Sequence, residues 1–254
     1  MSTTTVLHLL KLQLFAAAAR CRLFSSVPHS SSTLEHAITE TGTVSAKTKT
    51  KVIAKFCGRI PYDVGLKLQR SYVQRHLAAT KGNTGCGSAN VLLLLEHDPV
   101  YTVGIRSDVY SLQEEERLKG GCDRGGLITF HGPGQLVVYP ILNLSSFGPQ
   151  AGVRWYVEQL ELTLIRLCQE RFGLKTWRSP HTGVWTGGMD FPDGSQDRKL
   201  AAIGVRHIVP CGIEGKGVTS LTLELGRQVG VVDVIEPFCN VFAQQFGCDV
   251  VRNL

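Results

Sequence analysis

Apolar residues recur at helical spacing in three parts of the chain. Tyr62, Leu66, Val73 and Leu77 predict a first amphipathic helix. A longer stripe predicts a second helix that ends at Gly173, and it consists of Val153, Val157, Leu160, Leu164, Leu167 and Cys168. The apolar positions near the end of the chain predict a last helix with Ile235, Phe238, Val241, Phe242 and Phe246 on its buried side.

Short apolar runs between these helices predict strands. Residues 90–95 form a continuous apolar run, and a second strand is expected at 100–104 after Pro99. Residues 124–139 contain two strand-like segments around a turn at 131–134. Further strands are expected at 174–177, 183–186 and 199–205, with a flexible loop at 82–87 and a polar loop at 187–198. Strands mixed with a few helices predict an α/β or α+β domain, a single mixed sheet flanked by helices.

The first 50 residues differ from the rest. They are rich in Ser, Thr, Leu and Ala, and they contain Lys11, Arg20 and Arg22 with no acidic residue before Glu35. This composition is typical of a mitochondrial transit peptide. A secretory signal is the alternative, because residues 12–19 form a short apolar core, but the two arginines after that core favour the mitochondrion. We therefore expect residues 1–50 to be a transit peptide and linker, and residues 51–254 to be the folded domain.

Charge and composition exclude several classes of protein. The net charge is +6 over 254 residues, and the first 50 residues hold five basic against two acidic side chains, so half of that excess lies in the leader. The remainder has no basic patch interleaved with aromatic residues, which excludes nucleic-acid binding. It has no run of about 20 apolar residues, which excludes a membrane-spanning helix. The eight cysteines include no CxxC pair, so we expect neither a metal site nor a disulfide framework.

Three residues could carry acyl chemistry. Cys211 lies in a Val-Pro-Cys-Gly loop, where Gly212 leaves room for a substrate near backbone amides, although a buried cysteine in a turn has the same pattern. Lys199 begins a strand after a polar loop; its ammonium could favour a nearby thiolate, or it could simply be solvated. His131, among glycines, could be a general base or a structural histidine. Arg124 to Gly126 could hold phosphate but lack a full nucleotide motif.

Several motifs together make the chain resemble the lipoyl(octanoyl) transferase family of the LipB type over residues 52–254. The most specific signal is the RGGxxTxHGPGQ run at 124–135, and a lysine followed by a PCG loop strengthens it. The motifs that carry the resemblance are EHDPVYTVG at 96–104, RGGLITFHGPGQ at 124–135 with Tyr139, GVW at 183–185, KLAAIG at 199–204, PCG at 210–212 and TSL at 219–221.

This resemblance implies an enzyme of protein lipoylation in the mitochondrial matrix, with the fold of biotin protein ligases and lipoate ligases. It would take octanoyl from the phosphopantetheine of acyl carrier protein and place it on a lysine of lipoyl-accepting proteins, such as glycine cleavage H protein and E2 lipoyl domains, with no cofactor of its own. Cys211 matches the cysteine that becomes the thioester, and Lys199 matches the lysine that lowers its pKa. The acyl pocket would be lined by Arg124, Gly125, Gly126, Leu127, Ile128, Thr129, Phe130, His131, Ala202, Ile203 and Gly204.

One internal segment of the family pattern is missing. In the family, the lysine strand is followed by an SHGxALN segment and a DLxxF stretch, whereas here Val205 and Arg206 run directly into the Cys211 loop. About two dozen residues and one of three pocket-lining segments are absent, as in an alternatively spliced or a mispredicted product. Loss of a strand should expose a sheet edge. We therefore expect low stability and weak activity for this form.

Three other functions fit part of the pattern. An ATP-dependent lipoate ligase would share the fold, but the cysteine after Pro210 argues against it. A hydrolase that uses Cys211 and His131 would release free octanoate. A variant that only binds acyl carrier protein would fit the missing segment.

Overall fold

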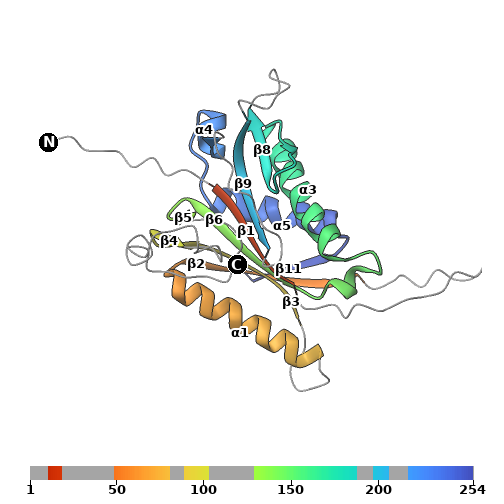
Figure 1. Ribbon diagram of the computed structural model, residues 1–254. Coiled ribbons are helices and arrows are strands. Elements are labelled where there is room, and N and C mark those ends of the chain that lie inside the picture. Colours follow the sequence, from red (N-terminus) through yellow and green to blue (C-terminus); the bar gives the residue numbers. More distant parts are fainter. Residues whose placement is uncertain are drawn as a thin grey trace, which may run out of the picture.

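The computed structural model describes residues 11–18, 49–80, 89–102, 129–187, 197–205 and 217–253. They form a mixed sheet of nine strands, flanked by helices, with strand order β11-β2-β3-β6-β1-β9-β8-β7 and with β10 paired to β9 (Figure 1). The strands are β1 (Lys11–Ala18), β2 (Lys51–Ile60), β3 (Asn90–His97), β6 (Gln135–Leu142), β7 (Trp177–Arg178), β8 (Val184–Gly187), β9 (Asp197–Val205), β10 (Gly217–Val218) and β11 (Asp249–Asn253). A separate pair consists of β4 (Val100–Thr102) and β5 (Thr129–His131).

Helices cover both faces of this sheet. On one face lies α1 (Tyr62–Thr80), and on the other lie α3 (Val153–Phe172) and α5 (Val232–Phe246), as Figure 1 shows. The short helices η2 (Leu144–Phe147) and α4 (Leu221–Leu225) complete the described elements. Alternate residues of the central strand β6 serve the two layers: Leu136 and Val138 pack with α3 and α5, whereas Val137 and Tyr139 face α1. The predicted α/β class is confirmed.

Most elements with a strong apolar pattern are confirmed. The three predicted helices correspond to α1, α3 and α5, and Gly173 ends α3 in the left-handed conformation, with φ +63°. Strand 90–95 is the core of β3. The strand expected at 174–177 is displaced, because pairing with β8 involves only Trp177 and Arg178. The polar loop is shorter than expected at its end, because Asp197 and Arg198 already pair with β8. The loop at 82–87 lies outside the described residues.

The main surprise is β1, which comes from the segment that composition assigns to the transit peptide. It lies between β6 and β9 and runs parallel to both, with Leu12 opposite Leu136 on one side and Ala201 on the other. Its sequence, KLQLFAAA, has an apolar run from Leu14 to Ala18, which is typical of a strand in the middle of a parallel sheet. The expectation of an exposed sheet edge beside the lysine strand is therefore wrong for the described residues, because β1 pairs with β6 and β9. Cleavage of the leader remains a prediction.

Among the described residues, no helix is long and apolar enough to cross a membrane.

Candidate functional site

Lys199 lies on β9, in register with Trp185 of the neighbouring strand β8. Its side chain is half-buried, and its Nζ donates a hydrogen bond to the carbonyl oxygen of Thr182 at 3.0 Å. The same nitrogen lies 4.8 Å from the centre of the buried Trp185 indole ring. Both neighbours favour the ammonium form, one as an acceptor and one through the negative face of its ring. The amine is therefore held in place rather than free in solvent.

Burial lowers the pKa of Lys199 below its ordinary value, and the negative charge of Glu161 partly opposes this effect. The cause is desolvation, which disfavours the ammonium more than the neutral amine. A lysine that gives up its proton more easily than an exposed one is better suited to proton transfer near neutral pH. The environment of Lys199 thus fits both roles expected of it, a positive charge near a thiol and a group that can move a proton.

The chain returns to Lys199 after the loop that contains Cys211. Gly217 and Val218 form β10, which pairs with Arg198 and Lys199, and the Thr219 amide donates to the Lys199 carbonyl at 3.0 Å. Cys211 lies outside the described residues, six positions before Gly217. Six extended residues span at most about 20 Å. The chain is therefore anchored at Gly217, beside β9, and its length keeps Cys211 no more than about 20 Å from Gly217.

This anchor point is fixed by a partly buried carboxylate, that of Glu224, whose side chain is 11% exposed. Glu224 of α4 accepts from Arg198 Nε at 3.0 Å and from Arg198 Nη2 at 2.9 Å, and it also accepts from the Thr219 hydroxyl. Although burial raises the pKa of Glu224, these hydrogen bonds and the Arg198 charge together hold it below its usual value. Ser220 caps α4 by accepting from the Leu223 amide. Thr219 of the TSL motif, together with the ion pair between Glu224 and Arg198, thus holds the end of β10 against β9.

The described cysteines are poor nucleophiles. Burial raises the pKa of Cys168 to about 12, of Cys239 to about 11 and of Cys248 to about 12. Burial also raises the pKa of the half-buried Cys57. Because the thiolate is the attacking species, none of these four thiols is activated. The remaining cysteines, Cys21, Cys86, Cys122 and Cys211, lie outside the described residues.

His131 is fully buried, and both of its ring nitrogens have partners. Nδ1 lies 2.8 Å from Gln135 Oε1, and Nε2 lies 3.3 Å from Thr102 Oγ1. The ring also stacks on Tyr62, with centroids 6.0 Å apart. A general base must lie within hydrogen-bond reach of the reacting proton, and the fully buried ring of His131 presents neither nitrogen at the surface. The structural interpretation of His131 is therefore favoured, and the Cys211/His131 hydrolase loses its proposed base.

The described parts of the expected acyl pocket lie on β5 and β9. Thr129 to His131 form β5, just before β6. Ala202 to Gly204 lie on β9, which is separated from β6 by β1. Ala202 and Ile203 are in register with Val137 and Val138 of β6, at a distance of two strand spacings, about 10 Å. Phe130 is 46% exposed and packs against Tyr101, which gives this region an apolar surface. Ile203 packs instead in the core under α3 and α5. Arg124 to Ile128 lie outside the described residues.

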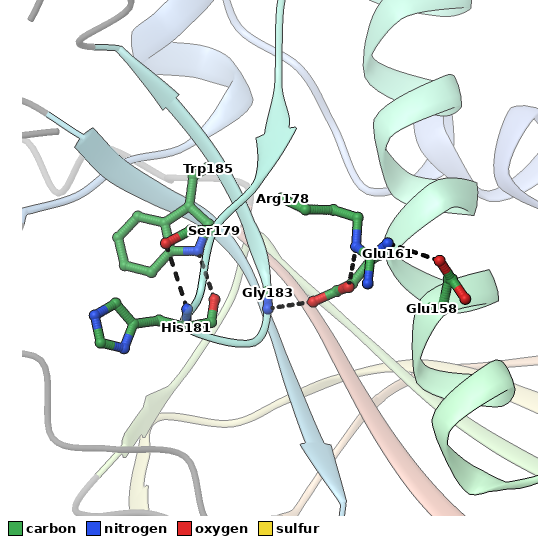
Figure 2. A network of polar contacts seen from close by, with 7 residues as sticks. All are labelled: Glu158, Glu161, Arg178, Ser179, His181, Gly183 and Trp185. Carbon is green, nitrogen blue, oxygen red and sulfur yellow. Dashed lines mark hydrogen bonds and ion pairs between the residues drawn. The ribbon is translucent and has the colours of Figure 1, made fainter. Parts of the chain in front are cut away.

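The sequence interpretation missed the hydrogen bonds that join Lys199 to Thr182 and Gly183 to Glu161, the second of which Figure 2 shows. A signal was present for two of the residues, because Gly183 begins the GVW motif and Glu161 is a carboxylate on an apolar stripe. Glu161 falls between Val157 and Leu164 on the buried stripe of α3, where a carboxylate is unexpected. The contact of Thr182 with Lys199 has no sequence signal, because a backbone carbonyl makes it.

Comparisons with known proteins place the chain in a family. The model of the lipoyl protein ligase A/B catalytic domain matches residues 61–209. The mitochondrial octanoyl-acyl-carrier-protein:protein N-octanoyltransferase LIPT2 of Danio rerio is 44% identical, over 81% of this chain and 97% of that protein. LIPT2 of Homo sapiens is 38% identical, over 76% and 93%. Among solved structures, lipoate-bound LipL1 of P. falciparum has a TM-score of 0.48 and 9% identity, over 79% of this chain and 66% of that one.

The alignment to the Danio rerio protein also bears on the missing segment. It spans 234 positions but uses 81% of the 254 residues, about 206, so about 28 positions have no residue in this chain. This shortfall has the size expected from the segment missing ahead of Cys211. The mitochondrial location expected from the leader is confirmed, because these relatives are mitochondrial proteins. The domain match and the extent of these alignments show that the chain belongs to the lipoyl protein ligase A/B family.

Proposed function

We propose that this chain is an octanoyltransferase that carries the acyl group on Cys211. The observation that supports this most is the environment of Lys199, a half-buried amine with a lowered pKa, beside which the chain returns from the Cys211 loop. The family and the names of the relatives supply the acyl group and its donor. The acceptors would be lipoyl-accepting proteins, including glycine cleavage H protein and E2 lipoyl domains.

The reaction would take place in two steps. The Cys211 thiolate attacks the octanoyl thioester of acyl carrier protein, a new thioester forms on Cys211, and the phosphopantetheine thiolate leaves. The amine of an acceptor lysine then attacks this thioester, and an amide forms while Cys211 departs as a thiolate. Lys199 would stabilise both thiolates as an ammonium, and as an amine it would take the proton that the incoming lysine loses. The first step exchanges one thioester for another, so no nucleotide and no cofactor of the protein is needed.

The experiment combines the chain with octanoyl-acyl carrier protein and a lipoyl domain in the absence of ATP. We expect octanoyl on the acceptor lysine and no product with Cys211→Ala. With Lys199→Ala we expect the rate to fall by at least about 100-fold. The matched control is Cys57→Ala, which removes a half-buried thiol on β2 and should leave the rate unchanged. Modification that requires ATP and free octanoate would instead indicate a lipoate ligase, and release of free octanoate without an acceptor would indicate a hydrolase.

A second candidate, a variant that only binds acyl carrier protein, is favoured by the missing segment alone. Binding of octanoyl-acyl carrier protein without any acyl transfer would support it against the transferase.

A further inference from the structure

A single peptide group joins Lys199 to a buried carboxylate. The Thr182 carbonyl accepts from Lys199 Nζ at 3.0 Å, and the amide of the same peptide group, that of Gly183, donates to Glu161 Oε1 at 3.0 Å. The carbonyl and amide of a trans peptide point in opposite directions. Glu161 and Lys199 therefore bind opposite sides of one planar group, and Figure 2 shows the side that Glu161 binds.

Glu161 is itself held firmly. Its side chain is 5% exposed, and its second oxygen accepts from Arg178 Nε at 2.8 Å. Arg178 also donates to Glu158 through Nη1 at 2.8 Å, so the guanidinium joins two carboxylates of α3 to β7, as Figure 2 shows. A buried carboxylate with charged and amide donors on both oxygens has little freedom to move. It can act as a fixed acceptor for the Gly183 amide.

The Glu161 carboxylate is needed as an acceptor because residue 183 is a glycine, as its geometry shows. Its φ is +129°, which side chains rarely permit, and a Cβ there would lie 2.6 Å from the Ala201 carbonyl and 3.2 Å from Lys199 Cε. Glycine is thus required for the close approach, but glycine also allows the neighbouring peptide to rotate. The reversed peptide would point the Thr182 carbonyl at the Glu161 carboxylate and remove the acceptor from Lys199. The carboxylate selects the orientation that serves Lys199.

We infer that Glu161 is a positioning residue for Lys199 and acts through the peptide group between Thr182 and Gly183. A carboxylate that accepts from one end of a peptide polarises it, and this strengthens the acceptor at the other end. Trp185 supports the same segment, because its indole nitrogen donates to the His181 carbonyl at 2.9 Å. The functional consequence of this inference rests on the proposed role of Lys199 in acyl transfer, whereas the structural link does not.

Glu158 offers the matched control. It binds the same guanidinium of Arg178, from the same helix, but the contact to Gly183 belongs to Glu161. Glu161→Gln keeps an acceptor for the Gly183 amide and loses the charge, whereas Glu161→Ala loses both. Glu158→Gln weakens the ion pair alone. These three variants separate orientation of the peptide, charge near Lys199, and the ion pair with Arg178.

The first measurement is the pH dependence of acylation of Lys199 by acetic anhydride, followed by peptide mass spectrometry on the full chain. It needs no octanoyl substrate. We expect the fraction of reactive amine at a fixed pH below the Lys199 pKa to rise about tenfold in Glu161→Ala and about threefold in Glu161→Gln, and to stay unchanged in Glu158→Gln. Circular dichroism verifies that each variant is folded, and Glu161→Leu, which also removes both the acceptor and the charge, replaces Glu161→Ala if that variant does not fold.

Three outcomes would overturn the inference. Equal effects of Glu161→Ala and Glu161→Gln would mean that charge alone acts, equal effects of the two Gln variants would mean that the ion pair acts, and no effect in any variant would mean that Lys199 is independent of Glu161. In the transfer assay, kcat should be highest in Glu158→Gln, lower in Glu161→Gln and lowest in Glu161→Ala. The KM for acyl carrier protein should be unchanged. A parent chain without transfer, but with the expected labelling order, would reject the proposed function and leave the positioning role intact.

Discussion

Lys199 is held where its charge is costly to the fold. Its amine lies between a carbonyl and an indole ring, and burial lowers its pKa below the ordinary 10.5. In the folded chain Lys199 therefore loses its proton at a lower pH than in the unfolded chain. The unfolded chain binds more protons between those two pKa values, so the free energy of unfolding rises with pH across that interval. A side chain kept at this cost is better explained by reactivity than by stability.

This gives a prediction for the pH dependence of stability. The free energy of unfolding of the parent, compared with that of Lys199→Met, should increase as the pH rises from neutral towards 10.5, because Lys199→Met removes the titrating amine. Urea unfolding at a series of pH values measures this difference. The control is Lys175→Met at an exposed lysine. A difference that is constant or falls with pH would mean that the amine is not desolvated.

Gly183 is the second residue on which the site depends. Gly183→Ala should destabilise the chain by about 1 to 3 kcal/mol, because the residue has φ +129° and its Cβ would meet the Ala201 carbonyl at 2.6 Å. It should also slow acyl transfer, since the new methyl group would contact Lys199 Cε. Thermal unfolding and the transfer assay measure these two effects.

The matched control for Gly183→Ala is Gly173→Ala at the end of α3. Gly173 also has a positive φ, +63°, but a Cβ there meets nothing within 4 Å. It should cost about 1 kcal/mol and leave transfer unchanged. Equal effects on transfer at both glycines would show that the close approach to Lys199 does not matter.

At the scale of elements, β1 changes the account of the missing segment. Without it, β6 and β9 would each present a row of unpaired backbone groups in the middle of the sheet. The chain fills this position with residues 11–18, parallel to both neighbours. A segment with the composition of a transit peptide thus contributes to the same sheet as the lysine strand, and its removal on import would open that sheet.

We therefore expect a chain without residues 1–48 to unfold at a lower temperature and to aggregate more readily than the full chain. A chain without residues 1–10 is the control, because it keeps β1. Thermal unfolding and size-exclusion chromatography compare the two. If both truncated chains unfold at the same temperature, β1 does not contribute to the sheet.

The elements that the sequence predicts are those with a long, regular stripe. Helices α1, α3 and α5 follow from their spacing, and β3 follows from its apolar run. Strands β2 and β11 were missed, since their residues alternate irregularly and β11 lies at an exposed edge. The apolar run of β1 reads equally well as a targeting segment and as a buried strand. Lys199 follows from the family pattern, but its link to Glu161 depends on how α3 packs near β8, which no local pattern encodes.

At the scale of the whole molecule, the sheet gathers the proposed chemistry on one strand and its neighbours. Lys199 and the segment 202–204 lie on β9, β10 brings the chain back from the Cys211 loop, and β8 supplies the indole beside the amine. The low stability and weak activity expected of the shortened form stay predictions. Turnover equal to that of a chain with the missing segment restored would contradict them.

The central claim is that Cys211 carries the acyl group, and intact-mass spectrometry after mixing the full chain with octanoyl-acyl carrier protein, without ATP or acceptor, tests it most directly. We predict a mass increase of one octanoyl group, removal of the group by neutral hydroxylamine as expected for a thioester, and its absence in Cys211→Ala. An adduct that persists in Cys211→Ala, or a parent chain that binds octanoyl-acyl carrier protein and gains no octanoyl group, would contradict the account.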